Sequence, residues 1–280
     1  MSGPGPEGLA GGERATRVRA MRNKLAPLLC AVAVALLLAP PVMAEDSAAD
    51  IARRSRERGA LNLLGLRAEL KLTTVLKDGR RKEQVLTSTA KRVGGRLHSL
   101  ARFSQPAGVA GVAVLTVEGA APGEPADISL YLPKLKRVRK VAKGQRGQSF
   151  METDFNYADL GGSGGERDES LRRVGETKVL DRLAHVLRGK AGPDSPYGEV
   201  TLYVDQETDV PVKAEYSDRE GKPLKVYRAV QLKKFKDRSF AAEAVMENLQ
   251  TGSRTTLEVL KLEEVQLGDE AFTERALERG

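Results

Sequence analysis

Regular alternation of apolar and polar residues is the feature of this chain that most restricts its fold. In residues 66–72 (LRAELKL), the apolar side chains at 66, 68, 70 and 72 alternate with charged ones. Because successive side chains of a β-strand point to opposite faces of a sheet, this pattern predicts a strand with one buried and one solvated face. Residues 128–132, 199–205 and 210–216 repeat the pattern. The chain is therefore predicted to be mainly β.

Short turn signals separate the alternating segments. Asp78-Gly79 is a hairpin signal before the return strand 84–93, and further turns follow at 206–208, 218–221 and 251–252. In residues 257–262 the apolar phase slips by one position, as a β-bulge would produce. About ten or eleven strands joined by short turns predict one antiparallel sheet.

Other local patterns complete the predicted elements. Short helices are expected at residues 47–58, where Ser47 can cap the first turn, and at residues 269–279. After the turn at 218–221, the side chains predicted to share a buried face are Leu224, Val226, Val230 and Leu232. No domain boundary interrupts the pattern, so residues 45–280 are predicted to form one domain.

A single antiparallel sheet of this size is expected to curl. Twist makes the sheet concave, and the concave face is apolar, so the predicted architecture is a half-open β-barrel. Its lining must be covered by a helix, a loop or a ligand. The predicted covers are the N-terminal helix and the irregular segment 149–167, in which Gly161, Gly162, Gly164 and Gly165 would allow a lid to move.

The first 44 residues are predicted to be a secretory signal peptide. Arg22 and Lys24 precede an apolar run of about 14 residues, which is short for a spanning helix, and small residues precede a cleavage site after Ala44. An uncleaved anchor is the alternative. Met21 stands where such a peptide normally starts, so residues 1–20 are interpreted as a start-site extension. Cleavage lowers the net charge from +8 to +5 on the exported protein.

Composition argues against several kinds of site. The single cysteine lies within the predicted signal peptide, which leaves no thiol for zinc, a disulfide or nucleophilic catalysis. His98 and His185 are far apart in the chain, and both are assigned structural or surface roles. No nucleophile motif surrounds Ser163 or Ser170, and the glycines of 161–165 lack the Lys-Ser/Thr of a phosphate loop. We predict no catalytic residue, no metal and no cofactor, and no nucleic-acid partner in the exported compartment.

Residues 130–160 (LYLPKLKRVRKVAKGQRGQSFMETDFNYADL) carry the most specific signal. An LYLP strand, a basic run, a phenylalanine before a small loop and a DF-Y-DL segment follow one another, and this order resembles the LolA-like outer-membrane lipoprotein-sorting family in its broad periplasmic branch. The resemblance spans essentially all of residues 45–280. Two features depart from the family pattern: Met151-Glu152-Thr153 replaces a Met-Gly-Ser-like turn, and the hairpin 181–196 is unusually polar.

The resemblance implies a half-open β-barrel with a helical lid, whose apolar cavity holds acyl chains in transit across the periplasm. It implies a non-enzymatic carrier of lipid or lipoprotein acyl chains, with an inner-membrane transporter and an outer-membrane acceptor as partners. From the alternation alone, the predicted cavity-lining residues are Leu70, Leu72, Leu130, Leu132, Val200, Leu202, Val204 and Val212. The predicted lid and motif residues are Phe150, Asp154, Phe155, Tyr157 and Leu160.

Each group has an alternative interpretation. The lid aromatics either gate the cavity or fix a loop by burying apolar area. Asp154 and Asp159 are predicted to accept hydrogen bonds from turn backbone N–H groups instead of catalysing proton transfer. The basic run 134–143 either meets lipid head groups or an acidic partner, or forms a solvated strand face.

Two other classes of function stay open beside the carrier. The chain could be a non-carrier sensor or accessory subunit of an envelope lipid or RND-type transporter, with the cavity filled by its own side chains. An enzyme acting on envelope lipids or glycans would need a catalytic constellation that the sequence does not display. The sequence names neither lipoprotein nor free lipid as the cargo, and it favours no direction of transfer and no oligomeric state.

Overall fold

The computed structural model describes Met1 and residues 46–57, 64–121, 124–161 and 170–279. The predicted signal peptide lies outside the described residues, as do Gly162, Gly164 and Gly165 of the predicted lid hinge. Residues 46–280 form one compact unit. The following account concerns the described residues of that unit.

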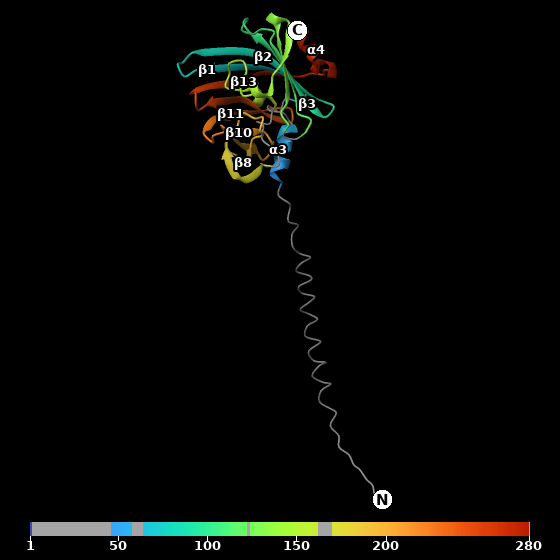
Figure 1. Ribbon diagram of the computed structural model, residues 1–280, viewed down its shortest axis with the longest axis vertical. Coiled ribbons are helices and arrows are strands. Elements are labelled where there is room, and N and C mark those ends of the chain that lie inside the picture. Colours follow the sequence, from blue (N-terminus) through green and yellow to red (C-terminus); the bar gives the residue numbers. More distant parts are fainter. Residues whose placement is uncertain (2–45, 58–63, 122–123, 162–169, 280) are drawn as a thin grey trace. The chain divides into compact units, whose positions relative to one another are not determined.

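The unit is built on one antiparallel sheet of thirteen strands (Figure 1). Strands that are adjacent in sequence pair with each other, except β6 with β7, and β1 also pairs with β13, which gives the order β6-β5-β4-β3-β2-β1-β13-β12-β11-β10-β9-β8-β7. The strands are β1 Leu66–Val75, β2 Arg81–Val93, β3 Arg96–Gln105, β4 Ala113–Val117, β5 Asp127–Leu132, β6 Arg137–Lys140, β7 Arg172–Val179, β8 Arg182–Lys190, β9 Glu199–Asp205, β10 Pro211–Ser217, β11 Pro223–Phe235, β12 Arg238–Asn248 and β13 Ser253–Glu264. In the described part of the chain, the edge strands β6 and β7 do not pair with each other. The predicted mainly β, half-open architecture is confirmed.

Short helices flank the sheet. They are α3 Ala48–Glu57, η1 Pro133–Leu135, η2 Lys143–Gln145, η3 Tyr157–Gly161, η5 Asp269–Phe272 and α4 Glu274–Glu278. Ser47 caps α3 as predicted, because its Oγ accepts a hydrogen bond of 3.1 Å from the backbone N–H of Asp50. None of the helices in the described residues is long and apolar enough to cross a membrane.

The C-terminal helix is interrupted where the sequence predicted one helix over residues 269–279. Thr273 adopts an extended conformation with φ −119° and ψ 158°, and its Oγ1 accepts a hydrogen bond of 3.3 Å from Ala276 N–H. Threonine therefore ends η5 and caps α4. Residues 267–279, including both helices, are called the C-terminal segment below.

The predicted bulge is confirmed in β13. Glu69 of β1 lies opposite Lys261, whereas the next residue, Leu70, lies opposite Val259, so Leu260 is the extra residue. The sheet has thirteen strands instead of the ten or eleven predicted, and β4 and β7 lie outside the strands and hairpins that the sequence identified. Most side chains of β7 are exposed, so its sequence lacks an alternating apolar face.

The predicted buried face of β11 is wrong. Val230 is exposed, and the buried side chains of the strand are Lys225 and Ala229. Two causes are visible: the register shifts on both sides of Gln231, and Lys225 finds a buried carboxylate described below. Alternation assigned the lysine to solvent, because an unpaired lysine is rarely buried.

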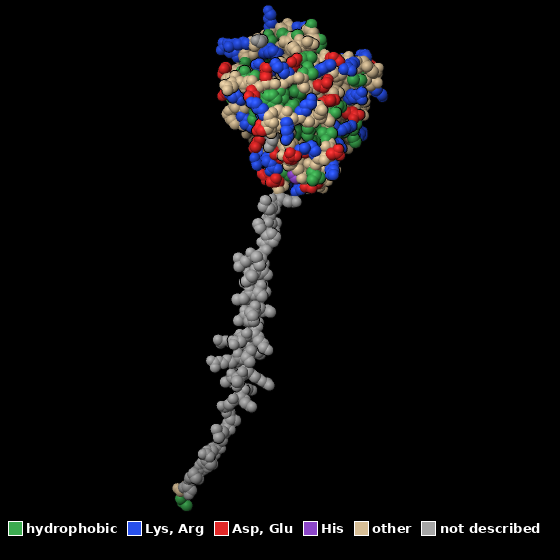
Figure 2. Space-filling model, turned by 180° about the vertical axis from the view of Figure 1, so that it is seen from behind, with side chains coloured by type: hydrophobic (Ala, Val, Ile, Leu, Met, Phe, Trp, Pro, Cys, Tyr) green, Lys and Arg blue, Asp and Glu red, His purple; other side chains and the backbone are tan. Residues whose placement is uncertain are grey.

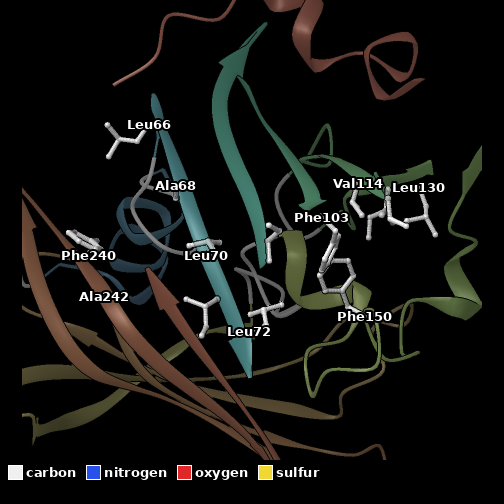
Figure 3. Packing of buried hydrophobic residues seen from close by; sticks show 14 residues of the cluster. Leu66, Ala68, Leu70, Leu72, Phe103, Val114, Leu130, Phe150, Phe240 and Ala242 are labelled. Atoms are coloured by element: carbon white, nitrogen blue, oxygen red, sulfur yellow. The ribbon is translucent and has the colours of Figure 1, made fainter. Parts of the chain in front are cut away.

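The sheet is covered on both faces. The inner face is the one that carries the inner-face cluster, a set of buried side chains shown in Figure 3: Leu66, Ala68, Leu70, Leu72, Leu86, Phe103, Val112, Val114, Ile128, Leu130, Phe150, Phe240, Ala242 and Leu257. On the outer face, Phe272 and Leu277 of the C-terminal segment pack against Ala113 and Leu115. Val114 faces inward between those two residues, so β4 is buried on both faces.

The inner face continues across the sheet to α3. Directly paired residues of neighbouring strands lie on the same face, and such pairs link Thr74, Thr255, Met246, Tyr227, Ala214 and Leu202. Leu202 packs with the cluster that buries Ile51 and Ala52 of α3. The N-terminal helix therefore covers one part of the inner face, as the sequence predicted.

Candidate functional site

Four of the eight predicted lining residues lie together. Leu70, Leu72 and Leu130 are buried members of the inner-face cluster, and Leu132 packs against it while partly exposed. Direct cross-strand pairs hold them in place: Leu72 opposes Leu257 and Leu130 opposes Val114. Alternation therefore assigned these side chains to one face.

The other four predicted lining residues do not join that cluster. Val204 is fully buried, and with the partly buried Leu202 it packs under α3 against Ile51 and Leu187. Val200 is fully buried on the same strand, β9. Val212 lies at a register shift in β10 and packs with Ala184 in a separate cluster. The eight residues are thus divided among different parts of the sheet.

The predicted lid motif packs directly on the inner-face cluster. Residues 149–160, called the lid loop below, place Phe150 in the cluster and Phe155, Tyr157 and Leu160 against it. The Phe150 ring lies 5.6 Å from that of Phe103 and 5.7 Å from that of Tyr157, measured between centroids. Figure 3 shows Phe103 and Phe150 next to each other, to one side of the row of side chains that β1 contributes. These aromatics hold the loop on the sheet.

The tip of the lid loop contains two residues in the left-handed conformation. Met151 has φ 50° and Glu152 has φ 63°, and the backbone N–H of Phe150 closes the loop by donating to the Phe155 carbonyl at 2.7 Å. Glycine is the residue that adopts positive φ without a steric penalty. The departure from a Met-Gly-Ser-like turn therefore places a side chain where the backbone disfavours one.

Asp154 fixes the middle of the lid loop to β13. Its carboxylate accepts hydrogen bonds from Ser253 Oγ at 2.5 Å and Thr255 Oγ1 at 2.7 Å, and its backbone N–H donates to Thr255 Oγ1 at 2.9 Å. Thr74 of β1 contacts the same threonine oxygen at 2.9 Å. The expectation that this carboxylate serves turn N–H groups is wrong, since hydroxyl groups of the sheet occupy it.

Asp159 fixes the end of the lid loop to β11. Its Oδ2 lies 2.5 Å from Lys225 Nζ and accepts a 2.6 Å hydrogen bond from the Asn156 backbone N–H, and its Oδ1 accepts one of 2.6 Å from Tyr197 Oη. The prediction that this carboxylate accepts a hydrogen bond from a turn N–H group is therefore confirmed for Asp159. The side chains of Lys225 and Asp159 are only 2% and 7% exposed, so this is a buried ion pair.

Aromatic rings enclose the Lys225 ammonium group. Its nitrogen lies 4.9 Å from the ring centroid of Tyr197 and 5.4 Å from that of Tyr216, distances at which a ring face attracts a cation. Burial, together with the negative charge of Asp159, raises the pKa of Tyr197 well above its usual value. The network therefore holds a neutral tyrosine, an ammonium and a carboxylate together under the lid loop.

The sequence missed Lys225 and Tyr197 as site residues. Each is distant in sequence from the lid loop, and only the pairing of β9, β10 and β11 brings both beneath it. Leu224 and Val226 flank Lys225, so the alternation assigned these two apolar side chains to the buried face and Lys225 to the solvated one. In the structure Lys225 is the buried residue. A buried lysine can be recognised only once its carboxylate partner is placed.

The predicted basic run lies at the edge of the sheet. Lys134, Lys136 and Arg137 are exposed, whereas Lys140 pairs with Glu274 at 3.5 Å and Lys143 with Asp194 at 3.0 Å. On the face drawn in Figure 2, lysine and arginine side chains are interspersed with acidic ones. The basic run is thus solvated, and two of its lysine side chains pair with carboxylates.

A buried arginine adjoins the base of the lid loop. Arg146 is 6% exposed, and its Nε and Nη1 atoms have no hydrogen-bond partner among the residues that the structure describes. Its backbone carbonyl accepts a 3.0 Å hydrogen bond from Ala158 N–H, which places it beside η3. Unpartnered buried N–H groups cost free energy that a ligand oxygen could recover.

The histidines and Ser170 make local contacts. His98 Nδ1 lies 3.4 Å from the Phe272 carbonyl, and His185 Nδ1 lies 3.7 Å from a carboxylate oxygen of Glu176. Burial lowers the pKa of His185. Ser170 Oγ donates to the Lys190 carbonyl at 3.0 Å, whereas Ser163 lies outside the described residues. The described residues hold no group of three potential metal-ligating side chains.

Comparison with known proteins gives both a family and structural relatives. A model of a family described as "Uncharacterized protein" matches residues 95–279. The crystal structure of a putative outer membrane lipoprotein-sorting protein domain from Vibrio parahaemolyticus superposes with a TM-score of 0.74 at 25% sequence identity, over 82% of this chain and 98% of that one. None of the curated proteins matches the chain.

Two further solved structures share the fold. A DUF1329 family protein from Desulfovibrio piger gives a TM-score of 0.71 at 21% identity, over 82% of this chain and 97% of that one. A LolA superfamily protein from Nitrosomonas europaea gives 0.63 at 18% identity, over 82% and 99%. The open antiparallel sheet described above is thus similar in fold to these three solved structures.

Proposed function

The chain belongs to the LolA-like outer-membrane lipoprotein-sorting family, and from this membership we propose that it is a non-enzymatic periplasmic carrier of lipid or lipoprotein acyl chains. The observation that supports the proposal is the apolar inner face around Leu70, Leu72, Leu130 and Leu132, with an aromatic lid loop lying on it. Burial of each methylene of an acyl chain there would contribute about 0.8 kcal/mol.

Entry of an acyl chain would require the tip of the lid loop to move. Phe150 occupies the inner-face cluster, so its ring must leave for a chain to take its place. The loop is bound to the sheet at Asp154 and Asp159 by buried polar contacts, whereas Glu152 at the tip is exposed. We therefore assign the movement to the tip and a fixed role to the two aspartates.

The polar end of the cargo needs a partner as well. Arg146 supplies two buried guanidinium nitrogens that have no acceptor within the described part of the chain, and it lies beside the lid loop. An ester or phosphate oxygen of a bound lipid would satisfy them, and charged donors form the stronger hydrogen bonds of this kind. Arg146 is accordingly proposed as the residue that orients the cargo.

Export and processing are part of the same proposal. Residues 1–44 act as the signal peptide, and residues 45–280 form the mature carrier, which takes cargo from an inner-membrane transporter and delivers it to an outer-membrane acceptor. The N-terminal residue of the protein recovered from the periplasm tests the first step. Glu45 supports cleavage after Ala44, while retention of the apolar run would show an anchored protein.

A reporter tryptophan can locate the cargo, because the chain contains no tryptophan. Phe155→Trp places the reporter on the inner face in the lid loop, and Tyr131→Trp places it on the outer face, both at half-buried aromatic positions. A brominated fatty acid should quench Phe155→Trp saturably and leave Tyr131→Trp nearly unchanged. Equal quenching of both, or of neither, would contradict a carrier site on the inner face.

The alternative function is a sensor or accessory subunit of an envelope lipid or RND-type transporter. The close packing of Phe150, 3% exposed against Phe103, favours it, since the protein's own side chain fills the inner face. Native mass spectrometry of the protein purified from the periplasm without detergent separates the two. A lipid or acylated-peptide adduct supports the carrier, and a bare mass that persists after incubation with lipid supports the accessory subunit.

A further inference from the structure

The outer face of the sheet, opposite the inner-face cluster, is hollowed beside the C-terminal segment. A groove of about 810 Å³ is enclosed by the C-terminal segment and by the outer face of β1, β2 and β3. Arg67, Thr89 and Leu100 are direct cross-strand neighbours in its wall, as are Thr87 and Arg102. Paired residues share a face of the sheet, so these five side chains stand together.

The sheet separates this groove from the inner-face cluster. Leu86 and Phe103 oppose each other and belong to that cluster, and they alternate along the strands with Thr87 and Arg102. Because neighbouring residues of a strand point to opposite faces, a ligand in the groove cannot contact the lid loop. The groove and the inner-face cluster are therefore separate from each other.

Positive charge dominates the groove. Its lining holds four arginines, Arg67, Arg102, Arg275 and Arg279, and one carboxylate, Glu270. Arg67 pairs with Glu263 at 3.2 Å on the exposed rim. Over the residues that the structure describes, the other three arginines have no carboxylate within ion-pair distance. The groove therefore carries uncompensated cationic groups.

Arg102 is the most confined of the four. Its guanidinium donates to the backbone carbonyls of Leu277 at 3.0 Å, Ala276 at 3.3 Å and Gly111 at 3.4 Å. These neutral acceptors fix its orientation without balancing its charge, and burial lowers the pKa of Arg102. A cation withdrawn from water in this way favours a bound anion.

The rest of the lining is apolar or hydroxylic. Leu100, Leu267, Ala271 and Ala276 form an apolar surface, and Thr87 and Thr89 add hydroxyl groups. Ligand sites commonly have volumes in the range of this groove, with a mainly apolar lining and a few polar groups that orient the ligand. Arginine binds phosphate with two parallel N–H donors, which a point charge cannot provide.

We propose that this outer-face groove binds a phosphate-bearing amphiphile, with its phosphate on the unpaired arginines and its apolar part along Leu100 and Leu267. The site goes beyond the proposed acyl-chain carrier, because it lies on the other face of the sheet and recognises the polar end of a lipid. An inorganic anion alone would leave the apolar lining without a partner. An amphiphile uses both parts of the groove.

Calorimetric titration with dihexanoyl phosphatidic acid, below its micelle concentration, tests the site. Inorganic phosphate and uncharged dihexanoylglycerol are the comparison ligands. The test variant is Arg275→Gln/Arg279→Gln, because both side chains are exposed. The control variant is Arg137→Gln/Arg139→Gln on the exposed edge strand β6, which removes the same charge elsewhere.

The wild-type protein should bind the phosphatidic acid at least about tenfold more tightly than either comparison ligand. Charge-assisted hydrogen bonds are stronger than neutral ones, so the test variant should weaken binding by about tenfold or more while the control stays within about twofold. Equal losses in the two variants, or phosphate or dihexanoylglycerol binding as tightly as the lipid, would overturn the proposal.

Two measurements distinguish failure of the carrier proposal from failure of the groove proposal. Quenching of the Phe155→Trp reporter by brominated fatty acid should be unchanged in the Arg275→Gln/Arg279→Gln background. Loss of quenching with intact phosphatidic acid binding would remove the inner-face carrier and keep the groove. Intact quenching with no phosphatidic acid binding would remove the groove alone.

Discussion

The lid loop and the C-terminal segment cover opposite faces of one sheet by different physical means. The lid loop adds to its aromatic packing a buried carboxylate bound by hydroxyl groups and a second one bound by a buried lysine. The C-terminal segment is held by Phe272 and Leu277 and by a guanidinium on backbone carbonyls, and it leaves a charged groove beside it. Buried charged groups thus fix the position of the lid loop, whereas the C-terminal segment is held by apolar side chains and by hydrogen bonds to neutral backbone carbonyls.

The largest expected effect is on the ion pair beneath the lid loop. Lys225→Met leaves Asp159 buried without a cation, so the free energy of unfolding should fall by about 3–5 kcal/mol in urea titrations. Lys222→Met is the matched control, because its pair with Glu220 is exposed, and it should change stability by less than about 0.5 kcal/mol. Similar effects of the two substitutions would show that the lid loop does not depend on a buried ion pair.

Removing a buried phenylalanine ring from either face of the sheet should have the next largest effect on stability. Phe150→Ala and Phe272→Ala each remove a ring that is 3% exposed, and each should cost about 3 kcal/mol of unfolding free energy. Only Phe150→Ala should alter the affinity for a hydrophobic fluorophore, since that ring occupies the proposed acyl site. A change of fluorophore affinity in Phe272→Ala of the same size would contradict the assignment of that site to the inner face.

The two faces of the sheet also differ in how much of their structure could be predicted from the sequence. Alternation identified β1, β9 and the bulge at Leu260, because each of these strands has a half-buried face. It failed for β7, whose side chains are mostly exposed, and for β11, where Lys225 is buried. The aromatic lid was predictable from a contiguous motif. The outer groove was not, because Arg67, Arg102, Arg275 and Arg279 meet only through strand register and the position of the C-terminal segment.

Alkaline pH should weaken the lid-loop network through Tyr197. The pKa of Tyr197 is raised in the folded protein, so its contribution to stability is present below about pH 10, where the unfolded tyrosine ionises, and is lost as pH rises further. Tyr197→Phe should cost about 1 kcal/mol at pH 8 for the lost hydrogen bond. At about pH 11 the unfolded tyrosine ionises while the folded one stays neutral, so wild type loses stability that the phenylalanine variant keeps, and the difference should vanish or reverse. A difference that stays constant between these pH values in urea titrations would contradict the prediction.

The smallest effect concerns the backbone at the tip of the lid loop. Glu152 has φ 63°, and its exposed side chain pairs with Lys82, so replacing it tests backbone strain against a surface ion pair. Glu152→Ala removes the pair and keeps the Cβ, and the exposed pair is worth less than about 1 kcal/mol. Glu152→Gly also relieves the positive φ, so it should be more stable than the alanine variant by about 0.5–1 kcal/mol in thermal or urea unfolding. Equal stability of the two variants would mean that the tip carries no strain. If glycine stabilises the tip and at the same time slows fluorophore entry, the strain at Glu152 would be one means by which the lid loop opens while its two aspartates stay in place.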